Sequence, residues 1–76
     1  MTNLTEFKVA LLRKGMTAEQ LADSIGMSRA SLSYKMNSRR EFTQSEIKQI
    51  CEVLDLAQDE RDRIFFGNNV DSESTQ

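Results

Sequence analysis

The stretch that decides the fold is "TAEQLADSIGMSRASLSYKMN", residues 17–37. It contains two signals for the start of a helix, because Thr17 and Ser28 can each accept a hydrogen bond from the backbone of the turn that follows. Thr17 also opens "TAEQ", the pattern of a capping box completed by Gln20. Gly26 lies between the two starts and can adopt the left-handed conformation that ends a helix. The stretch therefore predicts two short helices, one from Thr17 to Gly26 and one beginning after Ser28.

The residue types inside this stretch suit a helix pair that crosses at a steep angle. Two helices joined by a turn of three to four residues cross at about 90–120°. Ala22 is small enough to let the helices approach closely, and Gly26 follows it by four residues. The side chains expected to fill the angle are Leu21, Ile25, Met27 and Leu32.

The rest of the chain also shows helical periodicity. Apolar residues recur at helical spacing over residues 4–14, and Gly15 follows as a C-cap. Thr43 opens a second capping box, "TQSE", ahead of an apolar stripe that contains Ile47 and Ile50. The segment "LAQDERDRIFFG", residues 56–67, predicts a short fifth helix. No alternating run or hairpin signal indicates a strand, so we expect an all-α fold.

Length and composition set the domain organisation. Seventy-six residues correspond to one domain, which we place at residues 1–67. Residues 68–76, "NNVDSESTQ", have one apolar residue in nine, and we expect a disordered C-terminal tail there. No apolar run approaches the ~20 residues that span a bilayer, and the first residues do not resemble a signal peptide. With a single cysteine, the sequence favours a cytoplasmic protein that is nucleoid-associated in a bacterium.

The residues that carry most enzyme chemistry are missing. The chain has no histidine, which removes the usual general base and the commonest metal ligand. Cys51 lies inside the apolar pattern of residues 47–54, where a thiol behaves as a small hydrophobe. We therefore expect a protein that is not an enzyme and that has no cofactor, no metal and no small-molecule ligand.

Charge is distributed unevenly along the chain. Residues 1–42 hold seven Lys/Arg and four Asp/Glu, a net charge of +3, whereas residues 43–76 hold three and eight, a net charge of −5. The total is −2. This asymmetry indicates one face that meets an anion and another that is turned away from it.

The central stretch resembles the Cro/C1-type (XRE) helix-turn-helix family of small phage and bacterial regulators. The resemblance covers residues 4–66 and rests on "QLADSIGMSRASLSYKMN" followed by "SRREFT". Ser38 stands where the family frequently has glycine. The resemblance implies a five-helix, lambda-repressor-like DNA-binding domain. Its second and third helices would form the helix-turn-helix, with the third helix in the major groove.

The free face of the third helix supplies the candidate site. With Leu32 and Met36 inward, its outward residues include none that is acidic. Arg29 can give two parallel donors to guanine, and a methyl group such as that of Ala30 suits a thymine methyl. The candidate base-contacting residues are Arg29, Ala30, Ser33 and Tyr34. The candidate phosphate-contacting residues are Thr17, through its helix N-terminus, and Asn37, Arg39 and Arg40.

A dimer would supply the contacts that one copy lacks. Two third helices about one DNA turn (~34 Å) apart would read a near-palindromic operator. A short helix cannot easily bury three adjacent apolar side chains, so the candidate dimer interface is Ile64, Phe65 and Phe66. The alternative is that all three pack on the first and fourth helices.

Two functions stay open from the sequence. The first is a sequence-specific DNA-binding transcriptional regulator of phage or prophage type, which acts on double-stranded DNA as a homodimer. The second is a protein-interaction module on the same fold, an antitoxin or an antirepressor-type partner with weak or no DNA binding. The acidic isoelectric point of about 5.0 favours the second slightly.

Overall fold

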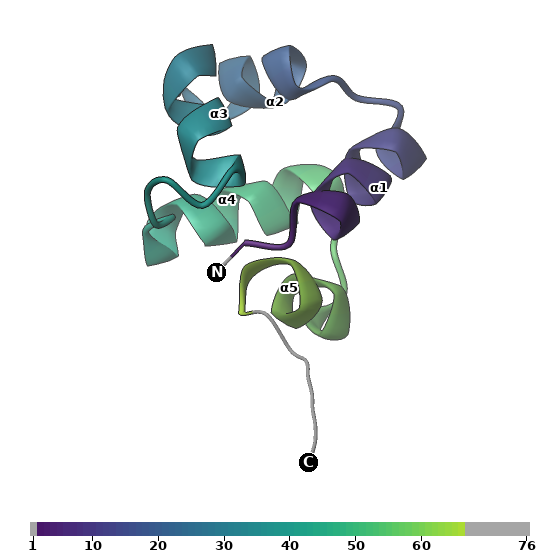
Figure 1. The fold of residues 1–76 in the computed structure, drawn as a ribbon. Coiled ribbons are helices and arrows are strands. Elements are labelled where there is room, and N and C mark those ends of the chain that lie inside the picture. The colour runs from purple at the N-terminus through teal and green to yellow at the C-terminus, as the bar shows by residue number, and fades with distance from the viewer. Residues whose placement is uncertain (1, 67–76) are drawn as a thin grey trace.

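A computed structural model describes residues 2–66, which form five α-helices and no strand. The helices are α1 (Leu4–Lys14), α2 (Ala18–Ile25), α3 (Arg29–Met36), α4 (Gln44–Leu54) and α5 (Gln58–Phe65). In Figure 1, α2 and α3 lie on one side of α4 and α5 lies on the other, with α1 crossing beside α4. The expected all-α, five-helix fold is confirmed. The predicted tail over 68–76 lies outside the described residues, within which no helix is long and apolar enough to cross a membrane.

Local hydrogen bonds begin α2, α3 and α4, and end α1 and α2, where the sequence predicts. Both capping boxes are complete, with Thr17 paired to Gln20 and Thr43 paired to Glu46 through side-chain and backbone bonds. Ser28 accepts from the first turn of α3. Gly15 and Gly26 end α1 and α2 with φ of 69° and 70°, the left-handed region that glycine enters without steric cost.

The core lies between the helices, with α4 packed against α1 and α2, and α5 packed against α1. Phe7, Leu21, Leu32 and Ile50 are the largest fully buried side chains, one from each of the first four helices. Phe7, Phe42 and Phe65 form an aromatic cluster with ring centroids 5.3–5.9 Å apart. The other buried residues are Ala10, Leu11, Ala22, Met36, Ile47, Leu54 and Ile64.

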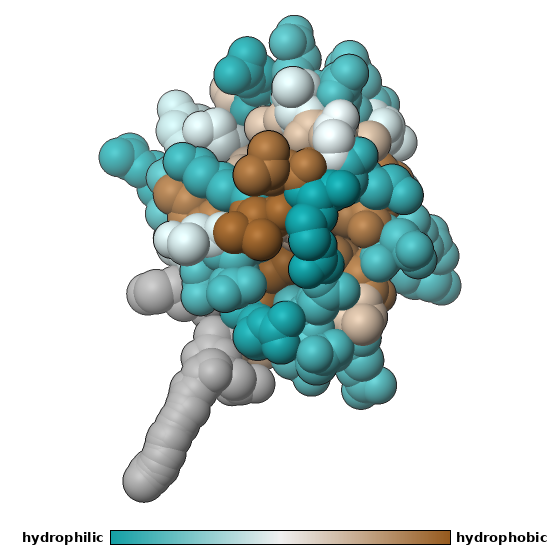
Figure 2. Space-filling view, turned by 90° about the vertical axis from the view of Figure 1, so that its right-hand side faces the viewer, coloured by the Kyte–Doolittle hydropathy of each residue, from teal (hydrophilic) through white to brown (hydrophobic). Residues whose placement is uncertain are grey.

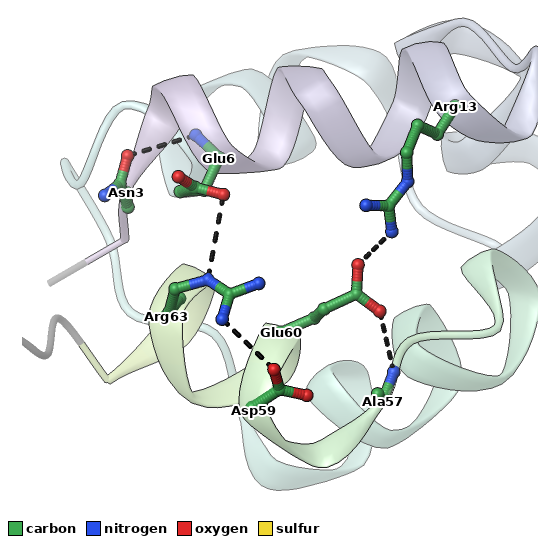
Figure 3. Close-up of polar contacts among 7 residues, drawn as sticks. All are labelled: Asn3, Glu6, Arg13, Ala57, Asp59, Glu60 and Arg63. Carbon is green, nitrogen blue, oxygen red and sulfur yellow. Dashed lines mark hydrogen bonds and ion pairs between the residues drawn. The ribbon is translucent and has the colours of Figure 1, made fainter.

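Ion pairs join α5 to α1 across the surface of the domain (Figure 3). Arg13 of α1 donates to the carboxylate of Glu60 in α5. Arg63 lies 4.0 Å from Glu6 and 3.2 Å from Asp59. Much of the acidic charge of α5 is therefore paired with α1 or within α5 itself.

The structure corrects two of the three candidate dimer residues. Ile64 and Phe65 retain only 2% and 6% of their exposed area because they fill the core of their own chain. The physical reason is the packing of α5 on the rest of the chain: the ring of Phe65 contacts those of Phe7 and Phe42, and Ile64 belongs to the same core cluster. Phe66 remains 44% exposed, with the guanidinium of Arg61 5.7 Å from its ring centroid.

Candidate nucleic-acid interface

Small and apolar residues form the joint between α2 and α3. Leu21 and Ala22 of α2 are buried together with Leu32 of α3. The amide of Met27 donates to the carbonyl of Ala22 at 2.9 Å, which closes the turn around Gly26. The predicted roles of Ala22 and Gly26 agree with this arrangement, although Ile25 and Met27 are only partly buried.

The joint presents one face of α3 to solvent. Leu32 and Met36 point into the core, so the side chains between them on the opposite arc are exposed. All four residues that we predicted to contact bases lie on this exposed arc: Arg29, Ala30, Ser33 and Tyr34. Tyr34, at 47% exposure, is a large side chain that the core does not use.

The loop after α3 folds back against the last turn of that helix. The amide of Arg39 donates to the carbonyl of Tyr34 at 2.8 Å, and Ser38 adopts a φ of 63° to make the reversal. The guanidinium of Arg40 lies 6.0 Å from the ring centroid of Tyr34. Arg39 and Arg40 are both exposed, so the loop adds two cations to the edge of the α3 face.

The N-terminus of α2 adds backbone donors to the same region. The amide of Thr17 and that of Gln20 are used within the capping box. The amides of Ala18 and Glu19 have no acceptor among the described residues, as expected for the first turn of a helix. Two free N–H groups and the positive end of the helix dipole together suit a phosphate oxygen.

Asn37 is partly committed to the helix that it follows. Its side-chain Nδ2 donates to the carbonyl of Ser33 at 2.8 Å, so it caps the C-terminus of α3. One amide hydrogen remains for another acceptor. Asn37 therefore has fewer side-chain donors left for a phosphate than Arg39 or Arg40 has.

Sequence reasoning missed the partner of Lys35. Its ammonium group lies 2.7 Å from both carboxylate oxygens of Glu46, and the two side chains are only 14% and 21% exposed. Burial alone raises the pKa of Glu46, but the hydrogen bonds from Lys35 and Thr43 and the charge of Lys35 outweigh it and hold the pKa below its ordinary value. Lys35 thus ties α3 to the start of α4. The "TQSE" pattern predicted that Glu46 caps α4, but it did not indicate that the same carboxylate also binds Lys35.

A second contact that the sequence did not indicate links the starts of the two helices. Arg29 Nη1 lies 4.0 Å from Oε1 of Glu19, the second residue of α2. Both side chains are about 70% exposed. An acidic residue therefore borders the face that we predicted to meet DNA.

Two short helices joined at a glycine turn, the second with an exposed, non-acidic face, define a helix-turn-helix domain. The chain belongs to the helix-turn-helix domain family, whose model matches residues 8–64. This family is related to the Cro/C1-type proteins that the sequence resembles. The search of the curated proteins found no match to the chain.

Proposed function

We propose that this protein is a sequence-specific DNA-binding transcriptional regulator of the Cro/C1 type, from a phage or prophage. It places α3 in the major groove of double-stranded DNA and binds a near-palindromic operator as a homodimer. It regulates by occupying the operator and excluding polymerase.

The observation that carries the proposal is the composition and continuity of one surface. The exposed arc of α3, the free amides at the start of α2 and the arginines of the 38–40 loop lie next to one another in the fold. A recognition helix inserted in the groove needs phosphate donors on both sides of it, and these two elements supply them. Because Lys35 is held by Glu46, we assign it no contact with DNA.

The side chains suggest a division of roles. Arg29 stands in the first turn of α3, the part of a recognition helix that reaches the base edges. Its guanidinium can donate to O6 and N7 of one guanine. Ala30 and Ser33 suit a thymine methyl group and a polar base edge. Tyr34, whose ring centroid lies 6.0 Å from the guanidinium of Arg40, is assigned with it to the sugar–phosphate backbone.

Selection of bound duplexes from a random pool tests the proposal. A recovered palindrome with a guanine at a fixed position in each half-site is the expected result. Arg29→Ala should then weaken binding to that operator by about 5- to 150-fold, the equivalent of ~1–3 kcal/mol, and relax the preference at the guanine. Unchanged affinity and unchanged base preference would show that Arg29 does not read a base.

One observation favours the protein-interaction alternative. Leu12 of α1 is 80% exposed and Val9, three residues earlier, is 44% exposed. Figure 2 shows apolar side chains gathered on the face that forms the right-hand side of Figure 1, where the C-terminal ends of α1 and α4 lie. An antitoxin or antirepressor-type module would use such a patch to bind its partner.

Salt dependence separates the two functions. A DNA-binding regulator loses affinity steeply as salt rises, because each phosphate contact releases condensed counterions. We expect log K to fall linearly with log salt for the wild-type chain, with a shallower slope when Arg39 and Arg40 are both changed to Gln. A chain that retains no duplex even at low salt supports the interaction module.

A further inference from the structure

Glu19 is an unexpected residue at the edge of a DNA-binding face. It is the second residue of α2 and carries one of the two free amides that suit a phosphate, the other being that of Ala18. Its carboxylate lies 4.0 Å from the guanidinium of Arg29, and about 70% of each side chain is in contact with solvent. Glu19 stands in the first turn of α2, where the helix dipole favours an acidic residue. An ion pair this exposed adds little to folding, so folding does not account for the position of Arg29 beside it.

We propose that Glu19 is a specificity-determining residue that weakens binding to DNA lacking the operator bases. This inference rests on the proposed function and concerns the ratio of operator to non-operator affinity. On DNA without the operator bases, the carboxylate of Glu19 neutralises the charge of Arg29. On the operator, Arg29 leaves Glu19 and binds a guanine.

The charges on the interface support this role. The exposed cations of α3 and its following loop are Arg29, Arg39 and Arg40, whereas Lys35 is occupied by Glu46. On non-operator DNA, Arg29 stays beside Glu19, and the pair carries no net charge toward the phosphates. Non-specific affinity arises almost wholly from neutralised phosphates, so losing one of three cations reduces it substantially.

On operator DNA, a guanine competes with Glu19 for the guanidinium of Arg29. A guanine offers its guanidinium two acceptors in a fixed geometry, which an exposed carboxylate at 4.0 Å does not match. Glu19 then loses its cationic partner and stays in solvent, to which about 70% of its side chain is already exposed. The acidic side chain therefore costs binding energy on most sequences and little on the operator.

Glu19→Gln tests the proposal, with Glu52→Gln as the matched control. Glu52 is also exposed on a helix and its substitution makes the same change in net charge, but it lies on α4 beside the surface hollow that Asp55 and Arg61 line, not beside Arg29. Affinities of each variant are measured by fluorescence anisotropy for the selected operator and for a scrambled duplex, over a series of salt concentrations. Thermal melting checks that each variant is folded.

We expect Glu19→Gln to bind the scrambled duplex about fivefold more tightly at low salt, with operator affinity changed less than twofold. The slope of log K against log salt on the scrambled duplex should steepen by about 0.9 for each copy bound. Glu52→Gln should leave the ratio of the two affinities as it is in the wild type.

Three outcomes would overturn the proposal. They are an equal gain on both duplexes, no gain on the scrambled duplex, and an effect of Glu52→Gln equal to that of Glu19→Gln. The proposed function fails differently, through recovery of no operator or an operator that Arg29→Ala still binds fully.

Discussion

At the scale of single residues, Ser38 shows the clearest conflict between side chain and backbone. Its φ of 63° lies in the left-handed region, where a residue with a Cβ atom costs roughly 1 kcal/mol more than glycine. Two hydrogen bonds partly offset this cost: the amide of Thr2 donates to Ser38 Oγ at 3.2 Å, and Oγ donates to the carbonyl of Thr2 at 3.3 Å. Both bonds are exposed, which limits their worth.

Replacing Ser38 by glycine should stabilise the domain. We expect Ser38→Gly to raise the free energy of unfolding by about 0.5–1 kcal/mol, a rise in Tm of a few degrees for a domain of this size. Ser38→Ala is the matched control, because it keeps the strain and removes both hydrogen bonds, and it should lower Tm. A glycine variant less stable than the wild type would show that the bonds to Thr2 outweigh the strain.

At the scale of elements, the pair between Lys35 and Glu46 fixes α3 relative to α4. Glu46 caps α4 through the amide of Thr43 at 2.9 Å and holds Lys35 through both carboxylate oxygens. Glu46→Gln keeps an acceptor for the cap and removes the charge that Lys35 faces. Because both side chains are mostly buried, we expect a loss of about 1–2 kcal/mol, measured by chemical denaturation at pH 7. A loss below about 0.3 kcal/mol would mean that the pair does not hold the two helices together.

The same carboxylate makes stability depend on pH. The pKa of Glu46 in the folded chain lies below its ordinary value of 4.5, so its contribution is complete above that value and is lost as pH falls through the folded pKa. The wild type should therefore lose more stability than Glu46→Gln between pH 6 and pH 3, as measured by thermal melting. Glu60, whose pKa is lowered by the amide of Ala57 and by Arg13, contributes to the same acid loss in both proteins and cancels in the difference. Parallel curves for the two proteins would contradict this assignment.

At the scale of the whole molecule, charge is segregated by the fold. The arginines of α3 and its loop stay exposed, whereas acidic residues of α5 pair with Arg13 and Arg63. This arrangement reconciles a net charge of −2 with a surface suited to DNA. A protein with few free cations binds non-specific DNA weakly, as the proposed role of Glu19 also requires.

Dimerisation belongs to this scale as well. Because Ile64 and Phe65 fill the core, Phe66 is the remaining candidate of the three for contact with a second copy. We expect Phe66→Ser to lower binding to a palindromic operator to the level measured for a single half-site, with unfolding free energy changed by less than about 1 kcal/mol. Sedimentation velocity with and without DNA measures the assembly.

Leu12→Ser is the control for the dimer, since it removes an even more exposed apolar side chain from α1. It should leave the preference for the palindrome intact. Loss of that preference in Leu12→Ser, with none in Phe66→Ser, would place the dimer interface on the exposed apolar side chains of α1, Val9 and Leu12.

The sequence by itself determined where α2, α3 and α4 begin, where α1 and α2 end, and which side of α3 is exposed. Caps such as Thr17 with Gln20 join residues three apart, so their geometry depends on the local chain alone. The burial of Leu32 and Met36 follows in the same way from helical periodicity.

Only the tertiary structure decided which long polar side chains meet and which apolar side chains the core accepts. Lys35 reaches Glu46 across 11 residues, and Arg13 reaches Glu60 across 47. Such contacts depend on how the helices pack against one another, and the packing of α5 on α1 buries Phe65 and leaves Phe66 exposed. For this reason the residues proposed to read DNA could be named from the sequence, but Glu19 beside Arg29 could not.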